Sequence, residues 1–378
     1  MKILILNHNQ ERLGTYWRCF FFAKQLSSLG HNITMICASG KRFDLLIRTK
    51  QINQKFKIIT LPRICYHKYF TGQALLRLPL TCLLVLILKY DLLYAFTVAQ
   101  PQIAIPAIVS KIIRKKTLII DWDDIWGKGL GLYHGHLINS IFYFFERKTL
   151  LFADKITYVS CLLGKEIKKL GFSHKAKKFP NGADYQNIKP ITKTEALKKL
   201  HLDKNKKYLL SLGNTYTTSL NLLITSFQLA AKKVKNLQLI LVGAAQAPVN
   251  LSKNIICQGS RPYQEIPYWL SAADILVLPM ENNLFEKARF PIRLGDYLCA
   301  KKPIISNAVG EVKYYLKNYH CGLITKSNKK ELTQAIIKLS QNPSLGKNMA
   351  LRARALAKNE LSWITIGQKL EIWLTNKN

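Results

Sequence analysis

Three carboxylates, Asp121, Asp123 and Asp124, directly follow the apolar run at residues 117–120. Carboxylates at the end of a strand can bind a divalent metal, accept hydrogen bonds from sugar hydroxyls or act as a general base. Any one of them can instead cap the start of a helix. Because the chain has only 21 Asp and Glu against 57 Lys and Arg, we interpret three neighbouring acids as a functional cluster.

A second candidate group begins at Phe290 and Pro291, where the proline suits the first turn of a helix. Arg293 adds a fork-shaped guanidinium to the positive end of that helix, which predicts a clamp for a diphosphate. Asp296 lies one turn further on, on the same face, and could accept hydrogen bonds from sugar hydroxyls. The alternative is an ion pair between Arg293 and Asp296 within the helix.

The loop after the first expected strand contains Gly14 and Thr15 and leads into a helix. Glycine lets backbone N–H groups at a helix start approach a phosphate or sugar oxygen closely. The loop lacks the G-x-G-x-x-G pattern, so it is not a dinucleotide fingerprint. An ordinary strand-to-helix turn would have the same sequence features.

Short apolar segments alternate with amphipathic helical segments along the chain, which predicts a parallel α/β architecture. We expect strands at residues 2–6, 32–36, 57–61, 117–120, 155–159, 208–212, 237–242, 275–278 and 303–306. Helices are expected at residues 17–29, 220–233, 265–272, 294–300 and 330–340. Gly30 should end the first of these helices.

The chain has 378 residues, enough for two domains, and a polar, lysine-rich segment at 175–207 separates two α/β halves. We predict an N-terminal domain at residues 1–185 and a second domain at residues 186–355. A C-terminal helix within residues 356–378 should return to the first domain. Two doubly wound, Rossmann-like domains would face each other across a cleft, and ligands of such sheets bind at the carboxyl ends of the strands.

Six short motifs occur in the order found in one enzyme family. They are GTYWR at 14–18, LGHNIT at 29–34, ADKITYVS at 153–160, PNGAD at 180–184, SAADILVLP at 271–279 and FPIRLGDYLCAKKPII at 290–305. With these motifs the chain resembles the retaining glycosyltransferases of family 4, which have the GT-B fold, over nearly its whole length. The resemblance implies an acceptor-binding N-terminal domain and a C-terminal domain that binds a nucleotide-diphosphate sugar.

The resemblance also implies roles for individual residues on the donor side. Arg293 and the helix start would stabilise the departing diphosphate, together with N–H groups of the loop at 213–215. Asp296 would hold sugar hydroxyls. No metal or cofactor is then required, because these groups neutralise the charge. The donor-binding residues expected on this basis are Asn181, Gly213, Asn214, Thr215, Arg261, Phe290 and Pro291.

On the acceptor side we expect Gly14, Thr15 and Asp121, with Asp124 orienting the acceptor. In similar enzymes the acceptor attacks on the face that the leaving group vacates, so its proton can pass to the departing phosphate. A dedicated base is then unnecessary. Domain closure should exclude water from the reacting groups.

Two departures from the family pattern bear on activity. Ala288 stands where the first residue of a Glu pair is usual, with Asp296 at the second position. Glu281 and Glu286 are nearby but have other spacings. The loop at 213–219 also lacks the Arg and Lys that often hold the diphosphate, so we expect Arg293 to take that role. These departures leave a catalytically inactive GT-B scaffold as an alternative.

The formal net charge of +36 predicts an anionic partner, with biased composition as the bland alternative. Residues 41–77 carry nine Lys and Arg and one acid, interleaved with aromatic and aliphatic residues. The apolar run at 78–88 is shorter than the roughly 20 residues that span a bilayer. This composition is typical of docking on anionic lipid and suits a lipid-linked acceptor, although a helix buried in the first domain would also explain the apolar run.

The remaining features concern partners and compartment. The charge alone would also allow a basic protein that binds nucleic acid or membranes, which is a further alternative function. The basic residues interleave with aliphatics and no recognition motif is present, so we expect no nucleic-acid partner. The eight cysteines lack metal-ligand spacing and predict free thiols in a reducing compartment. The apolar start of the chain, MKILIL, is too short for a secretory signal. We therefore expect a cytoplasmic enzyme, peripheral on the inner face of the cell membrane, that transfers a sugar from a UDP- or GDP-sugar to a saccharide or polyprenyl-linked acceptor during the synthesis of a surface polysaccharide, lipopolysaccharide or glycolipid.

Overall fold

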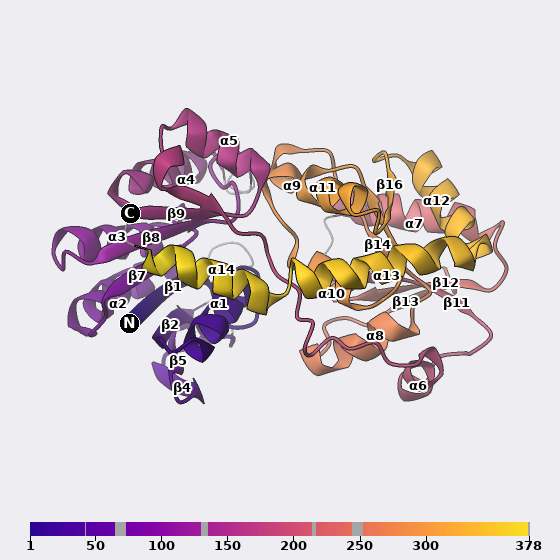
Figure 1. The fold of residues 1–378 in the computed structure, drawn as a ribbon, viewed down its shortest axis with the longest axis horizontal. Coiled ribbons are helices and arrows are strands. Elements are labelled where there is room, and N and C mark those ends of the chain that lie inside the picture. Colours follow the sequence, from indigo (N-terminus) through magenta and orange to yellow (C-terminus); the bar gives the residue numbers. More distant parts are fainter. Residues whose placement is uncertain (42, 65–72, 130–134, 214–216, 244–251, 377–378) are drawn as a thin grey trace. The chain divides into compact units, whose positions relative to one another are not determined.

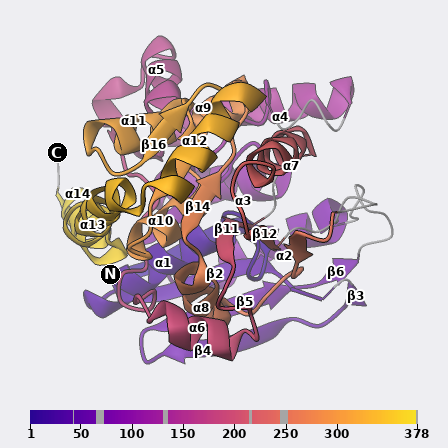
Figure 2. The ribbon, with the colours of Figure 1, turned by 90° about the vertical axis from the view of Figure 1, so that its right-hand side faces the viewer.

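A computed structural model describes residues 1–41, 43–64, 73–129, 135–213, 217–243 and 252–376 (Figures 1 and 2). The chain divides into two compact units. The first comprises Met1–Pro180 and Trp363–Asn378, and the second comprises Asn181–Ser362. From the sequence we predicted these divisions after residues 185 and 355.

The first unit is built on an eight-stranded sheet with the order β10-β9-β8-β7-β1-β2-β5-β4. Its strand pairs are parallel apart from β4 and β5, which are antiparallel. β3 and β6 form a separate two-stranded sheet. The strands are β1 (Lys2–Gln10), β2 (Asn32–Ala38), β3 (Phe43–Asp44), β4 (Arg48–Asn53), β5 (Phe56–Leu61), β6 (Arg63–Ile64), β7 (Leu92–Phe96), β8 (Thr117–Trp122), β9 (Lys155–Tyr158) and β10 (Ala176–Lys178).

The helices of this unit follow the strands along the chain. They are α1 (Tyr16–Ser28), α2 (Gln73–Ile87), α3 (Pro101–Ile112), α4 (His136–Lys148), α5 (Cys161–Lys169) and α14 (Trp363–Thr375), with short 3-10 turns η2 (Thr149–Phe152) and η3 (Ser173–Lys175). α1 ends as predicted, because Gly30 adopts a positive φ of 101° and the His31 N–H bonds back to the Leu26 carbonyl at 3.1 Å.

The C-terminal helix α14 packs against α1 within the first unit (Figure 1). The Trp363 ring stacks on Phe21 with a centroid separation of 4.8 Å and an interplanar angle of 11°. Gly367 lies against Gln25 so closely that a Cβ on the glycine would approach the Gln25 Cβ to 2.4 Å. Aromatic stacking and this small-residue contact attach the end of the chain to the first unit.

The apolar run at residues 78–88 forms the body of α2, which has Pro79 inside it. Arg77, Thr81 and Val85 are buried on one face, whereas Leu83 and Ile87 are more than half exposed on the other. The helix therefore faces the interior with one side and solvent with the other. Within the described residues, no helix combines the length and the apolar character that crossing a bilayer requires.

The second unit contains a six-stranded, fully parallel sheet with the order β13-β12-β11-β14-β15-β16. The strands are β11 (Lys207–Leu212), β12 (Leu237–Val242), β13 (Ile255–Cys257), β14 (Ile275–Leu278), β15 (Ile304–Asn307) and β16 (Leu323–Thr325). The helices are α6 (Lys193–Lys199), α7 (Thr217–Ala231), α8 (Ile266–Ala272), α9 (Leu284–Ala288), α10 (Ile292–Cys299), α11 (Gly310–Asn318), α12 (Lys329–Gln341) and α13 (Pro343–Asn359), with the 3-10 turn η4 (Tyr263–Glu265).

The core of the second unit lies between its sheet and the helices α7 and α12, which pack together (Figures 1 and 2). Phe227 of α7 and Ile336 of α12 meet the central strand residues Leu239 and Val277 there, and all four are fully buried. Burying each such side chain contributes about 1.5–3 kcal/mol. The two parallel α/β sheets confirm the predicted fold class.

The structure also contains strands that the sequence analysis missed. β7 lies at the centre of the first sheet, between β1 and β8, although no strand was expected there. β13 and β16, with three residues each, were missed in the second unit. Segments this short carry too few residues for a periodicity to be detected.

Candidate functional site

Three glycines follow consecutive strands at the carboxyl edge of the second sheet. Gly213, Gly243 and Gly259 come after β11, β12 and β13 and have positive φ values of 83°, 87° and 58°. A Cβ on Gly243 would lie 3.1 Å from the Gly213 Cα. Because these three residues have no side chain, a ligand can approach the backbone at the strand ends closely. We call the surface formed by Gly213, Gly243 and Gly259 the glycine floor.

The Gly213 N–H has a different partner from the one expected. It donates to the Val242 carbonyl at 2.7 Å, and the Gly243 N–H donates to the Gly259 carbonyl at 2.5 Å. These N–H groups complete the sheet, so the Gly213 N–H is not available to a diphosphate, which corrects that expectation. Gly213 contributes by having no side chain. Asn214 and Thr215 lie outside the described residues.

Arg293 lies at this glycine floor. It belongs to the first turn of α10, which begins after Pro291, and its Nη1 donates to the Leu212 carbonyl at 3.0 Å. A Cβ on Gly213 would come within 3.6 Å of the Arg293 Cδ and 3.7 Å of its Nη1. The structure thus places a half-buried guanidinium and a helix N-terminus at the end of β11. Both are features that bind phosphate oxygens.

Tyr297 attaches α10 to the neighbouring strands at a second point. It was not predicted from the sequence. Its hydroxyl accepts from the Leu212 N–H at 2.7 Å and donates to the Val277 carbonyl at 3.2 Å. Burial raises the pKa of Tyr297 to about 12, so it remains a neutral phenol. Because Tyr297 and Arg293 are one turn apart on α10, they hold the helix to β11 through the same residue, Leu212.

Asn181 supports the turn that precedes α10. Its Nδ2 donates to the Phe290 carbonyl at 2.6 Å, and the Phe290 ring packs edge-on against Tyr315 with centroids 5.3 Å apart. Phe290 and Asn181 are both buried. We expected Asn181 near the nucleotide. In the structure its side chain bonds to the backbone of the Phe290–Pro291 turn.

Asp296 is buried and faces a second carboxylate. The Tyr263 hydroxyl lies 3.2 Å from the Asp184 Oδ2 and 3.5 Å from the Asp296 Oδ1. Burial, followed by the charge of Asp184, raises the pKa of Asp296 to about 7. Asn187 Nδ2 donates to both oxygens of Asp184, at 3.0 and 2.9 Å. Asp296 therefore titrates near neutral pH, which the sequence alone did not indicate.

Arg261 lies near the last of the three glycines. Its Nε donates to the Gln258 carbonyl at 3.0 Å, and its Nη2 bonds to the Gln258 side chain. The residue is exposed, directly after Gly259 and Ser260. Its guanidinium is therefore held at the carboxyl edge of β13, on the side where we expected the nucleotide.

Two glutamates follow β14, and neither occupies position 288. Glu286 is buried and forms two hydrogen bonds with Arg289, at 3.0 and 2.9 Å. Burial raises the pKa of Glu286, and the charges of Arg289 and Arg293 oppose that rise. Glu281 accepts hydrogen bonds from Ser219 at 3.3 Å and Asn283 at 3.1 Å. Ala288 is fully buried.

On the first unit, Gly14 and Thr15 form the turn between β1 and α1. Gly14 has a φ of 57°, and a Cβ there would lie 2.4 Å from the Asn9 Nδ2. The Thr15 hydroxyl donates to Asp123 Oδ2 at 2.5 Å, and the Thr97 hydroxyl donates to Asp123 Oδ1 at 2.8 Å. Asp123 therefore binds two loops together. Burial and the nearby Asp121 raise its pKa.

Asp121, which we expected on the acceptor side, is fully buried and bonded to protein groups. Arg18 donates to its two oxygens at 2.9 and 2.8 Å, and the Thr157 hydroxyl donates at 2.5 Å. Arg18 also donates to the carbonyls of Phe179 at 2.9 Å and Pro180 at 3.3 Å. The pair stabilises the end of the first unit instead of contacting solvent.

Asp124 lies half-buried in a loop that Glu146 of α4 holds in place. The Glu146 carboxylate accepts from the Trp126 N–H at 2.7 Å, the Gly127 N–H at 3.2 Å and the Trp122 Nε1 at 3.2 Å. Burial raises the pKa of Glu146 to about 7. Glu146 was not predicted from the sequence, although it is the one acid in α4. Of the three expected carboxylates, Asp124 is the most exposed.

The described residues contain no group of three or more His, Cys, Asp and Glu side chains placed to hold a metal ion. Asp121 and Asp123 instead bond to arginine and threonine side chains. At these two positions the carboxylates are therefore held by protein groups.

Residues 192–356 match the family Glycosyl transferases group 1. This part of the chain is a group 1 glycosyltransferase domain. It contains the glycine floor, Arg293 and Asp296. The match confirms the resemblance on which the site residues were assigned, while their individual roles stay predictions.

Solved structures resemble the whole chain and confirm the GT-B fold around this group 1 domain. Sucrose-phosphate synthase from Thermosynechococcus elongatus has a TM-score of 0.76 at 14% identity, covering 99% of this chain and 98% of that one. HepE from Anabaena, solved with UDP and glucose, has a TM-score of 0.74 at 17% identity, with full coverage of both chains. WaaG, a glycosyltransferase involved in lipopolysaccharide biosynthesis, has a TM-score of 0.67 at 15% identity, again with full coverage.

One curated relative shares a shorter segment. TuaH of Bacillus subtilis (strain 168), named for a glycosyltransferase role in teichuronic acid biosynthesis, is 27% identical over 66 residues. The match spans 18% of this chain and 17% of TuaH. It supports the class of protein and does not extend to the substrates.

Proposed function

We propose that the chain is a retaining, metal-independent glycosyltransferase that uses a nucleotide-diphosphate sugar as donor. The observation that carries this proposal is the Arg293 guanidinium at the glycine floor of the group 1 domain, 3.0 Å from the Leu212 carbonyl. Bare backbone, a helix N-terminus and a fixed cation meet there. Together they match the shape and charge of a diphosphate.

In the proposed reaction the bond between the anomeric carbon and the diphosphate oxygen breaks, and negative charge grows on that oxygen. Arg293 and the start of α10 stabilise the charge. Because Leu212 and Tyr297 hold α10 in place before the reaction, this stabilisation requires no rearrangement. Asp296 and Arg261 bind donor hydroxyls and the nucleotide in this proposal.

The acceptor hydroxyl forms the new bond to the anomeric carbon on the face that the diphosphate leaves. Its proton passes to the departing phosphate oxygen, so the products are the glycosylated acceptor and a nucleoside diphosphate. Asp124, in the loop that Glu146 holds, orients the acceptor in this proposal, and the Gly14–Thr15 turn lines its binding site.

We further propose that the first unit docks on an anionic bilayer and that the acceptor is a saccharide or a lipid-linked sugar of a surface polysaccharide or glycolipid. Phe43, Leu45, Leu46 and Ile47 form one exposed apolar segment, with side chains between 51% and 62% exposed. Lys41 and Arg48 flank it, and Arg48 pairs with Asp44, the one acid within the segment. Exposed apolar groups between cations suit the interface of an anionic membrane.

Flotation with vesicles tests the docking proposal. The wild type should float with phosphatidylglycerol vesicles at low salt and less so at high salt. Replacing Leu45 and Leu46 with Ser should reduce flotation without changing the thermal midpoint. Absence of binding to anionic vesicles at low salt would remove the membrane from the proposal.

Ala288 favours one alternative, a GT-B scaffold without activity. Nucleotide release from UDP-glucose, other UDP-sugars and GDP-sugars separates the two functions. An active enzyme should release UDP or GDP faster than buffer alone, and a saccharide acceptor should raise that rate. An inactive scaffold should cleave none of these nucleotide sugars, although nucleotides should still raise its thermal midpoint.

A further inference from the structure

A partly exposed carboxylate, Glu281, follows β14 at the carboxyl edge of the second sheet. β14 pairs in parallel with β11, so both strands end at this edge. Adjacent strands of a sheet lie about 4.8 Å apart. The segment that carries Glu281 therefore leaves the sheet one strand away from Leu212, whose carbonyl accepts a hydrogen bond from Arg293.

Electrostatic effects on Glu286 also place Glu281 near Arg293. Burial raises the pKa of Glu286, the charges of Arg289 and Arg293 lower it, and the charge of Glu281 raises it further. Because such effects weaken with distance, Glu281 and Arg293 both lie near Glu286. Opposite charges therefore occupy the same part of this edge.

The backbone that precedes Glu281 is fixed by the ends of two other strands. The Met280 N–H donates to the Asn307 Oδ1 at 2.9 Å, and the Ser327 hydroxyl donates to the Met280 carbonyl at 3.2 Å. Asn307 is fully buried at the end of β15, and its Nδ2 donates to the Thr325 hydroxyl of β16 at 3.1 Å. These bonds position Glu281 before a ligand binds, which lowers the entropy cost of binding.

The Glu281 carboxylate has acceptor capacity left for a ligand. Its Oε1 accepts from the Ser219 hydroxyl of α7 at 3.3 Å, and its Oε2 accepts from the Asn283 Nδ2 at 3.1 Å. An ionised carboxylate accepts about four hydrogen bonds, so roughly two sites remain. Glu286 and Glu311 of the neighbouring helices are buried, whereas Glu281 is half-buried and open to solvent.

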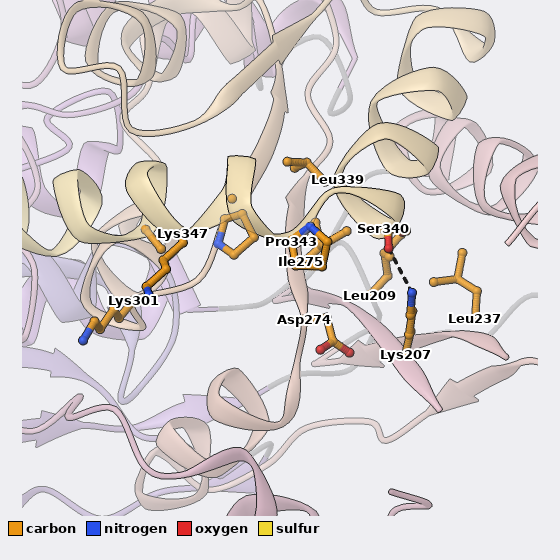
Figure 3. Close-up of a pocket in the computed structure, with 13 residues that line it drawn as sticks. Lys207, Leu209, Leu237, Asp274, Ile275, Lys301, Leu339, Ser340, Pro343 and Lys347 are labelled. Atoms are coloured by element: carbon orange, nitrogen blue, oxygen red, sulfur yellow. Dashed lines mark hydrogen bonds between the residues drawn. The ribbon is translucent and has the colours of Figure 1, made fainter. Parts of the chain in front are cut away.

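The acid at the other end of β14 is in a different state. Asp274 directly precedes the strand and lines the pocket at the opposite edge of the sheet (Figure 3). Its two oxygens accept from the Lys193 Nζ at 2.6 and 2.7 Å, so a cation neutralises it. Within the described part of the chain, Glu281 bonds instead to the neutral side chains of Ser219 and Asn283. Its charge is therefore available to a ligand.

The groups assigned to the donor follow the order of the strands. Arg261 comes after β13, the glycine floor covers the ends of β13, β12 and β11, and Arg293 is bonded to the end of β11. β14 is the next strand in the sheet. A donor with its nucleotide at Arg261 and its diphosphate at Arg293 therefore has its sugar at the end of β14, where Glu281 lies.

We propose that Glu281 binds hydroxyls of the donor sugar and selects a neutral sugar over a uronic acid. The inference rests on the proposed function, which places the diphosphate at Arg293. A carboxylate with two open acceptor sites suits two sugar hydroxyls, and hydrogen bonds to a charged group are strong. A carboxylate on the sugar would meet a like charge, so a uronic acid donor would bind poorly. The donor class is therefore a nucleotide-diphosphate sugar without an acidic group.

The variant Glu281→Gln tests this proposal, with UDP-glucose, GDP-mannose, UDP-glucuronate, UDP and GDP as the probes. Glutamine keeps the shape of the side chain and removes its charge. The variant should lose about tenfold or more in kcat/KM for the neutral donor that the wild type cleaves, because charge-assisted hydrogen bonds are lost. Its Kd for the free nucleotide should stay unchanged. The wild-type preference for the neutral donor over UDP-glucuronate should shrink about tenfold.

Two further variants separate recognition of the sugar from support of the fold. Ser219→Ala removes one bond to Glu281 but keeps its charge, so the preference for a neutral donor should remain. Glu195→Gln alters an exposed acid of α6 and should match the wild type. The thermal midpoint of each variant shows whether it is folded.

Three results would overturn the assignment of Glu281. The variant Glu281→Gln could behave like Glu195→Gln, it could lose affinity for UDP or GDP as strongly as for their sugars, or the wild type could prefer UDP-glucuronate. A wild type that neither binds nor cleaves any of these nucleotide sugars would overturn the proposed function, and with it this inference.

Discussion

Gly295 of α10 lies against the backbone of Gly182 so closely that a Cβ on Gly295 would come within 2.3 Å of the Gly182 carbonyl oxygen. The same Cβ would lie 3.0 Å from the Ala183 Cα. The helix that carries Arg293 therefore packs directly on the segment after Asn181, with no room for a side chain. This contact fixes the distance between α10 and the chain segment that begins the second unit.

Gly295→Ala should therefore destabilise the second unit and displace Arg293. Overpacking of this kind costs about 1–3 kcal/mol, so we expect a lower thermal midpoint together with lower turnover. Calorimetry and a nucleotide-release assay measure the two effects. Gly40→Ala is the control, because a Cβ at Gly40 would meet its nearest neighbour at 3.7 Å, an ordinary contact. Equal midpoints for the two variants would contradict the close packing.

Asp296 predicts a specific dependence of stability on pH. Its folded-state pKa is about 7, well above the ordinary aspartate value of 3.8, because burial and Asp184 disfavour its charge. Between these values the folded state holds a proton that the unfolded state has lost, so the unfolding free energy falls as pH rises through this window. Asp296→Asn removes this pH dependence. Its unfolding free energy should therefore rise by about 1–4 kcal/mol relative to that of the wild type between pH 4 and pH 8.

Denaturant unfolding at several pH values measures this difference for Asp296→Asn. The exposed carboxylate of Glu195 offers a control, Glu195→Gln, which removes one acid without altering the pair of Asp184 and Asp296. A wild-type-to-Asn difference that stays constant from pH 4 to pH 8 would show that Asp296 is charged throughout that range.

Arg18 and Asp121 predict a coupling between two buried charges. Arg18→Met leaves the Asp121 charge buried without its guanidinium and should cost about 3–5 kcal/mol of stability in the first unit. Adding Asp121→Asn removes that charge and should recover part of the loss. A double-mutant cycle in urea measures the coupling, and strictly additive effects would argue against the pair.

The sequence predicted the alternation of strands and helices because each long strand is a continuous apolar run between polar turns. It missed β7, since Leu92–Phe96 follows the apolar α2 after only a few residues and no periodicity separates the two. β13 and β16 were too short to detect. Tertiary position, which places β7 at the centre of the sheet, is not encoded in a local pattern.

The candidate site was predicted unevenly for a related reason. Arg293 and Asp296 belong to one local motif, so their spacing alone placed them on α10. Asp121 and Asp123 are bonded by Arg18, Thr15 and Thr97, which are distant from them in sequence. Long-range packing decides which carboxylate is buried and paired. The residue type alone does not reveal it.

The most direct test of the account is the turnover of Arg293→Ala with a nucleotide-diphosphate sugar that the wild type cleaves. We expect a loss of about 10²–10³-fold in kcat, because a fixed donor to the leaving group is removed. Arg293→Lys should retain part of the activity, and Arg352→Ala, at an exposed arginine of α13, should match the wild type. The thermal midpoint of each variant shows whether the fold is intact. Wild-type kcat in a folded Arg293→Ala would contradict the claim that this guanidinium stabilises the departing diphosphate.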